Sequence, residues 1–200
     1  MSHNAVTNHP IHELMTVRWS PYAFADRPVP AETLRSLFEA ARWAASSYNE
    51  QPWSYIVASK DDAAGYEKVL SCLVEANQAW AKFAPVLAIG CTSLKFKRNG
   101  TPNGVAVHDL GQASAYLALE AAAQGLQVHQ MAGILPDRVR ELFQVPEGVQ
   151  PLTALAIGFV GDPKSLPEEI GSRDTGHRTR KPLAEFVFSG RWGTTAPAVR

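Results

Sequence analysis

Arginine and hydroxyl side chains near the two ends of the chain have the spacing of a phosphate-binding site. Arg18 is followed two residues later by Ser20. Near the other end, Arg178 and Arg180 alternate with Thr179. A guanidinium fork matches phosphate oxygens, and a serine hydroxyl can donate to the same group. Because residues two apart in an extended segment share a face, both C-terminal arginines can contact one phosphate. The sequence predicts a phosphate clamp, although the C-terminal stretch alone is also typical of a solvated basic segment.

A polar loop between a predicted helix and a predicted strand could bind the edge of a planar heterocycle. Residues 46–53 read Ser-Ser-Tyr-Asn-Glu-Gln-Pro-Trp. Asn49 and Gln51 carry both donors and acceptors, so they can match the N–H and carbonyl pattern of a flavin ring. Loops on a rigid scaffold are common positions for binding residues. The alternative is a polar turn in which Asn49 caps a backbone group and Trp53 lies in the core.

Taken together and in this order, these three segments resemble the nitroreductase family of FMN enzymes. In that family an Arg-x-Ser pair contacts the FMN phosphate, and a basic-x-Arg pair before a proline completes the phosphate site. The Ser-Ser-x-Asn-x-Gln-Pro-Trp segment approaches the flavin from the partner subunit. The similarity covers about residues 11–192. It implies FMN as cofactor and the following cofactor-binding residues: Arg18, Trp19, Ser20, Tyr22, Ser46, Ser47, Asn49, Gln51, Asn77, Gln130, Met131, Ala132, Gly133, Arg178 and Arg180.

The resemblance also indicates which residues lie beside the flavin ring. The sequence departs from the family pattern at two positions. Asn77 matches an asparagine that bonds the polar edge of the flavin, and residues 130–133 match the segment beside its reactive N5. Family members often have a basic residue at the position of Tyr22 and a lysine at that of Trp80. With Trp80, a positively charged contact to the flavin is lost, and an aromatic side chain would take its place. The aromatic residues that we expect to line a substrate pocket are Tyr48, Trp80, Phe83 and Phe96.

The implied reaction takes place at the flavin, so no catalytic side chain is expected. NAD(P)H would reduce the flavin, and a small oxidised substrate, nitroaromatic or quinone-like, would then take the hydride in a ping-pong mechanism. One alternative is a flavin-binding sensor or storage protein without turnover. Another is a flavin-dependent dehalogenase or desaturase of the same fold.

Composition limits the other partners. The formal net charge is zero, which argues against a nucleic-acid or anionic-membrane surface. No apolar run approaches the roughly 20 residues of a membrane span, so we expect a cytoplasmic protein. His9 and His12 lack a third ligand, and no metal is expected. Cys72 and Cys91 form no CxxC pair, and two buried free thiols are the favoured interpretation over a disulfide.

Hydrophobic periodicity, prolines and glycines predict helices and strands without a regular βαβ alternation. Strands are expected over residues 53–59, 85–91, 126–130 and 151–160. Helices are expected over residues 11–18, 31–45, 61–73, 105–124 and 136–143. A short turn is expected at 77–80, and a polar loop or lid over 94–104. This mixture predicts an α+β fold with a small central mixed or antiparallel sheet flanked by helices.

The predicted organisation is a flexible N-terminus over residues 1–10 and a single FMN-binding domain over 11–192. Residues 162–192 are rich in Pro, Gly and charge, and cannot form a core by themselves. We expect them to form an extended arm that embraces a partner subunit in a homodimer with FMN sites at the interface. Small residues of the longest helix, Ala113 and 121–123, would allow close approach of either a partner helix or this chain's own backbone.

Overall fold

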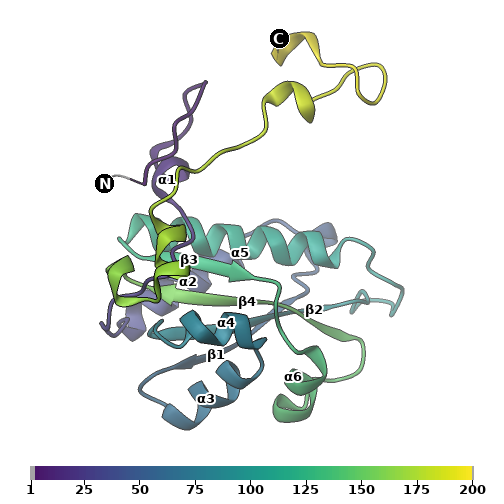
Figure 1. The fold of residues 1–200 in the computed structure, drawn as a ribbon. Helices are drawn as coiled ribbons and strands as arrows, with labels where there is room; N and C mark the ends of the chain where they lie inside the picture. The colour runs from purple at the N-terminus through teal and green to yellow at the C-terminus, as the bar shows by residue number, and fades with distance from the viewer. Residues whose placement is uncertain (1–2, 200) are drawn as a thin grey trace.

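A four-stranded antiparallel sheet forms the centre of the computed structural model, which describes residues 3–199 (Figure 1). Its order is β1-β2-β4-β3, so β3 is an edge strand that pairs with β4 alone. The strands are β1 (Trp53–Ser59), β2 (Val86–Ser93), β3 (Gln127–Met131) and β4 (Val149–Gly158). This arrangement confirms the predicted α+β class and shows that the small sheet is wholly antiparallel.

Both faces of the sheet are covered, which explains the continuous apolar run of β2. Leu87 and Ile89 pack into one core cluster, whereas Val86 and Ala88 pack into the other. Alternate side chains of a strand point to opposite faces, so a strand between two helical layers must be apolar at every position.

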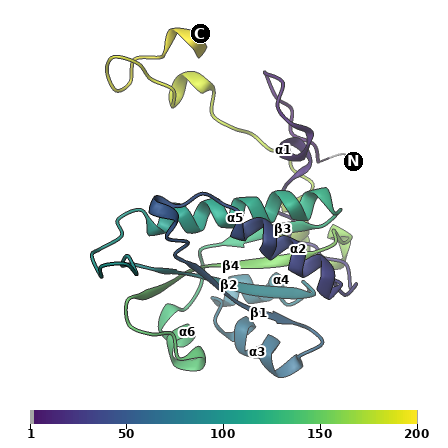
Figure 2. The ribbon, with the colours of Figure 1, turned by 180° about the vertical axis from the view of Figure 1, so that it is seen from behind.

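Helices lie on both sides of the sheet (Figure 2). One layer holds α2 (Ala31–Arg42) and α5 (Ala106–Ala123), with α1 (Glu13–Val17) against α5. The other holds α3 (Ala63–Ser71), α4 (Glu75–Ala81) and α6 (Pro136–Phe143).

The alanines of α5 serve the chain's own core. Ala113 and Ala121 are fully buried in the cluster that also contains Leu37 and Ala41 of α2. Their small side chains let α2 and α5 pack closely within one chain. The opposite face of α5 is exposed and carries Tyr116.

Several element bounds differ from the prediction by one to three residues, and α4 and β4 are the most informative cases. Residues 77–80 lie inside α4 and do not open a turn, because seven residues are too few for a clear period in the sequence. Strand β4 begins at Val149, two residues before the predicted start. Pro151 of β4 lies where the register with β2 shifts between Gly90 and Cys91, an irregularity that accommodates a proline.

The predicted C-terminal arm divides into two parts. Residues 163–174 form short helical turns and α7 (Glu168–Gly171) against the body of the protein. The later residues extend away from the sheet and its helices (Figure 1). In this outer part Phe186 is 57% exposed and Trp192 is 89% exposed, which is unusual for large apolar side chains without a partner surface.

Cys72 and Cys91 are buried free thiols, as predicted. Burial raises the pKa of Cys91 to about 11, so this thiol is inert at neutral pH. Within residues 3–199, no helix combines the length and the apolar character that a membrane crossing requires.

Candidate functional site

Four arginines from both ends of the chain line one pocket of about 180 Å³ at the start of β3. The pocket lies there because Gln127, the first residue of β3, holds the N-terminal segment. Its Oε1 accepts from the Trp19 N–H at 2.9 Å, and its Nε2 donates to the Val17 carbonyl at 3.1 Å. The lining residues are His3, Arg18, Trp19, Ser20, Arg173, Asp174, Gly176, Arg178 and Arg180. The structure therefore brings together the two sequence segments that suggested a phosphate clamp.

The arginine pocket has a large excess of positive charge. Burial lowers the pKa of Arg18, and the charge of Arg180 lowers it further. Burial also lowers the pKa of Arg178, and the charges of Arg18 and Arg180 lower it further. Within residues 3–199 none of the pocket's arginines forms an ion pair with a carboxylate. Such a site is suited to an anion of more than one charge.

Arg178 lines the pocket and also joins the two ends of the chain. Its Nη1 donates to the Arg18 carbonyl at 2.6 Å, and its Nη2 donates to the carbonyls of Thr16, at 2.6 Å, and His3. These bonds use its two terminal nitrogens to join the N- and C-terminal segments. Its Nε is buried and has no hydrogen-bond partner within residues 3–199. A buried donor without an acceptor is costly, so this atom also indicates that the pocket is built for an acceptor.

Asp174 fixes the chain beside this pocket and was not identified from the sequence. Its buried carboxylate accepts from the Tyr22 N–H at 2.9 and 3.0 Å and from the Ala23 N–H at 2.8 Å. Gln127, which holds Trp19, was also missed. A single aspartate in a charged segment and a glutamine at a strand start carry no spacing signal, since their partners are backbone groups distant in sequence.

A second group of predicted residues meets beyond the other end of β3. Asn77 of α4 donates from Nδ2 to the Gly133 carbonyl at 3.0 Å. Close by, Met131 is buried, Ala132 is exposed, and Gln130 Nε2 donates to the Ser114 carbonyl at 3.4 Å. Between the first and last residues of β3 the strand advances about 14 Å, at roughly 3.4 Å per residue. The edge strand thus connects the arginine pocket with the Asn77–Gly133 contact.

Gly133→Ala is expected to destabilise the protein by about 1–3 kcal/mol, the usual range for overpacking. A Cβ at this position would lie 2.5 Å from Asn77 Nδ2 and 2.8 Å from Val74 Cγ2, so α4 would have to shift. Thermal unfolding of the variant measures the effect. Gly104→Ala is the matched control, because a Cβ there meets nothing within 4 Å. Equal melting temperatures for the two variants would show that Asn77 and α4 accommodate the added methyl group without loss of stability.

The polar loop predicted to approach a ring has an unusual backbone. Tyr48, Asn49 and Gln51 have φ values of 54°, 55° and 51°, in the left-handed region that non-glycine residues rarely adopt. Side chains hold the loop in this form. The Ser47 N–H donates to Asp109 Oδ2 at 3.1 Å, and the Gln51 N–H donates to Ser46 Oγ at 3.0 Å. Backbone strain of this kind clusters at binding sites.

The predicted lid segment, residues 94–104, packs against this loop. The rings of Tyr48 and Phe96 meet edge to face at 5.8 Å. The Arg98 guanidinium lies 4.2 Å from the centre of the Tyr48 ring. The Lys97 N–H donates to Glu50 Oε1. Two of the four predicted pocket aromatics are therefore neighbours on an accessible surface.

The other two aromatics lie elsewhere: Trp80 is a core residue, and the assignment of Phe83 to a substrate pocket stays a prediction. Trp80 is only 2% exposed and packs in the core against Phe24, Tyr22 and His129. It faces the sheet because α4 must bury one side. Phe83 follows α4, and neither ring contacts the Tyr48–Phe96 pair.

The loop and the arginine pocket lie at opposite ends of α5. Asp109, in the first turn of this helix, holds the loop through Ser47. Gln127, just beyond the last turn, holds Trp19 at the pocket. Eighteen helical residues extend about 27 Å, so the loop and the arginine pocket are far apart along α5 within one chain.

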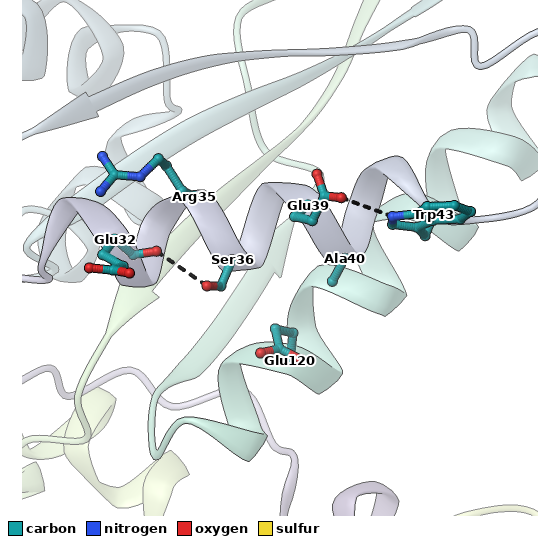
Figure 3. Close-up of a pocket in the computed structure, with 7 residues that line it drawn as sticks. All are labelled: Glu32, Arg35, Ser36, Glu39, Ala40, Trp43 and Glu120. Atoms are coloured by element: carbon teal, nitrogen blue, oxygen red, sulfur yellow. Dashed lines mark hydrogen bonds between the residues drawn. The ribbon is translucent and has the colours of Figure 1, made fainter.

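A separate hollow of the surface is a groove between α2 and α5, of about 510 Å³ (Figure 3). Glu39 accepts a bond from Trp43 Nε1 at 2.9 Å, and bonds from Arg42 and then Trp43 lower the pKa of Glu39 to about 2. The groove shares no residue with the arginine pocket. Its lining is mainly acidic and polar: Glu32, Arg35, Ser36, Glu39, Ala40, Trp43 and Glu120. It does not suit an anionic ligand.

Comparisons with known proteins agree with this arrangement. The sequence profile of the nitroreductase family matches residues 15–159. A protein of Methanothermobacter thermautotrophicus, provisionally named NADH dehydrogenase/NAD(P)H nitroreductase, is 31% identical over 174 residues, which cover 84% of each chain. A crystal structure described as an oxidoreductase containing FMN has a TM-score of 0.90 and 34% identity, covering 98% of this chain and 99% of its own. A nitroreductase family protein of Clostridium difficile 630 has a TM-score of 0.68 and 25% identity, covering 89% and 96%.

Proposed function

Since the chain belongs to the nitroreductase family and is an FMN-dependent oxidoreductase, we propose that the arginine pocket binds the FMN phosphate. The observation that carries this proposal is the group of arginines without carboxylate partners at the start of β3. Arg18 and Arg180 would contact the phosphate oxygens, and the Ser20 hydroxyl would donate to them. The unpartnered Nε of Arg178 would gain its missing acceptor.

The ring would lie toward the far end of β3. Asn77 would bind its polar edge and residues 130–133 would lie beside its N5, at a separation from the pocket that an extended ribityl chain can bridge. When bound, FMN supplies hydride transfer from NAD(P)H to an oxidised substrate. The protein's residues orient the ring and leave one face accessible to reductant and substrate in turn, as a ping-pong mechanism requires. The names of the relatives support NAD(P)H as the reductant.

A homodimer would complete the site. The strained loop over residues 46–53 lies about 27 Å along α5 from the arginine pocket of its own chain, so it would contact the flavin held by the partner subunit. The exposed Phe186 and Trp192 of the outer arm offer apolar area for covering that partner. The accessible face of α5 around Tyr116 is a further candidate for the interface.

The substrate pocket would be formed by Tyr48 and Phe96, whose rings would pack against a small planar oxidant such as a nitroaromatic or a quinone. Residues 94–104 would act as its lid, held by the Arg98 and Glu50 contacts.

An absorbance spectrum tests the function directly. The protein would be reconstituted with FMN, desalted, and measured before and after anaerobic addition of NADH or NADPH. We expect the flavin to be retained and its visible absorbance to be lost rapidly on addition of one of them. Menadione or a nitroaromatic compound should then restore the absorbance.

Other outcomes distinguish the alternatives. Retained flavin that both nicotinamides leave oxidised would favour the sensor or storage protein. Reduced flavin that is reoxidised only by a halogenated substrate would favour the dehalogenase. A protein that retains no flavin would contradict the proposal.

A further inference from the structure

Arg173, which the sequence pattern left without a role, also lines the arginine pocket. It belongs to the short 3₁₀ turn Ser172–Asp174, at the end of the C-terminal segment that packs against the body of the protein. Its guanidinium lies 5.4 Å from the centre of the Tyr22 ring. Tyr22 follows Ser20, which lines the pocket, by two residues.

The position of Arg173 is fixed by its neighbour. Asp174 is 1% exposed, and its carboxylate accepts from the backbone N–H groups of Tyr22 and Ala23. This clamp holds the turn against the N-terminal segment. The face of the Tyr22 ring then offers the guanidinium a favourable surface. That ring is itself fixed, since it packs edge to face on Trp80 and His129.

The charge of Arg173 has no carboxylate partner among the residues described. It adds positive charge to a pocket in which Arg18 and Arg178 already repel one another. Because Arg178 uses its terminal nitrogens on backbone carbonyls, it cannot present a fork to a ligand. The exposed guanidinium of Arg173, as a third fork beside those of Arg18 and Arg180, would restore that capacity.

We infer that Arg173 is a phosphate-binding residue of the FMN site, held in place over the Tyr22 ring. The inference rests on the proposed function, because the bound phosphate is that of FMN. Its ligand class is the terminal phosphate monoester of a flavin mononucleotide, as distinct from the uncharged ribityl end of riboflavin.

Arg173→Gln tests this when FMN and riboflavin affinities are measured in parallel by flavin fluorescence. We expect FMN binding to weaken at least tenfold, the scale of a lost charge-assisted contact, and riboflavin binding to stay unchanged. Tyr22→Lys combined with Arg173→Gln should restore part of the FMN affinity, since it returns a positive charge close to the position of the Arg173 guanidinium. Arg35→Gln, in the groove between α2 and α5, should change neither affinity.

Unchanged FMN affinity in Arg173→Gln would overturn the inference and leave the proposed function intact. An equal loss of FMN and riboflavin binding would also overturn it, because it would mean that the substitution disturbs the Asp174 clamp. If the wild-type protein itself fails to bind FMN, the proposed function falls and the inference with it.

Discussion

Arg18→Ala is expected to weaken FMN binding by about 2–3 kcal/mol, or roughly 30- to 150-fold in Kd, the scale of a hydrogen bond between charged groups. Arg18 lies in the pocket between both chain ends, and its burial lowers its pKa because no anion offsets the desolvation of its charge. Arg180→Ala should have an effect of similar size, since its charge faces the same pocket. Flavin fluorescence during titration measures both.

The repulsion between the arginines of the pocket provides controls for these two variants. The unfolding temperature of the apoprotein should not fall in Arg18→Ala, since the substitution removes repulsion from Arg180. Increasing salt should weaken FMN binding to the wild-type protein more than to either variant. Stoichiometric retention of FMN by both variants at dilute protein would contradict the phosphate assignment.

Trp80→Ala is expected to destabilise the protein by about 3–5 kcal/mol, the range for truncating a large aromatic side chain in a core. Trp80 is 2% exposed and lies among Phe24, Tyr22 and His129, so its loss leaves a cavity beneath Tyr22. Urea unfolding followed by far-UV circular dichroism measures the free energy of unfolding.

Trp43→Ala provides a matched control, because Trp43 is 71% exposed and should contribute little to stability. The comparison also decides between the two interpretations of Trp80. A pocket residue would change the KM for the oxidant and leave unfolding nearly unchanged. If Trp80→Ala behaved in this way, the core assignment would be wrong.

Local sequence signals predicted most elements. β1 has the predicted bounds, 53–59, because β-branched and aromatic residues stand between a proline and a charged turn. α6 also has its predicted bounds, since Pro136 begins it and its apolar residues keep a helical period. The end of α5 before Gly125 follows from the positive φ of that glycine, 76°.

The candidate site was predictable only in part, because much of it depends on contacts distant in sequence. Arg18 and Arg180 carry a recognisable spacing, so their meeting could be expected. Asp174 contacts the backbone of Tyr22, 152 residues away in the sequence, and Arg173 contacts the ring of the same residue. Contacts at such separations leave no local pattern in the sequence. Trp80 was misplaced because an aromatic residue in a short helix has no local signal for the face that it occupies.

The left-handed backbone of the 46–53 loop has a consequence for the entropy of binding. A loop that is free in solution must lose backbone freedom when a ligand orders it, at about 1–2 kcal/mol per residue. Here Asp109 and the Ser46 hydroxyl already hold Tyr48, Asn49 and Gln51 in rare conformations. That freedom is lost during folding, so a ligand arriving at the loop meets a rigid surface. Glycine at these positions would relieve the backbone strain, but the loop would then lose its conformational entropy when the ligand binds.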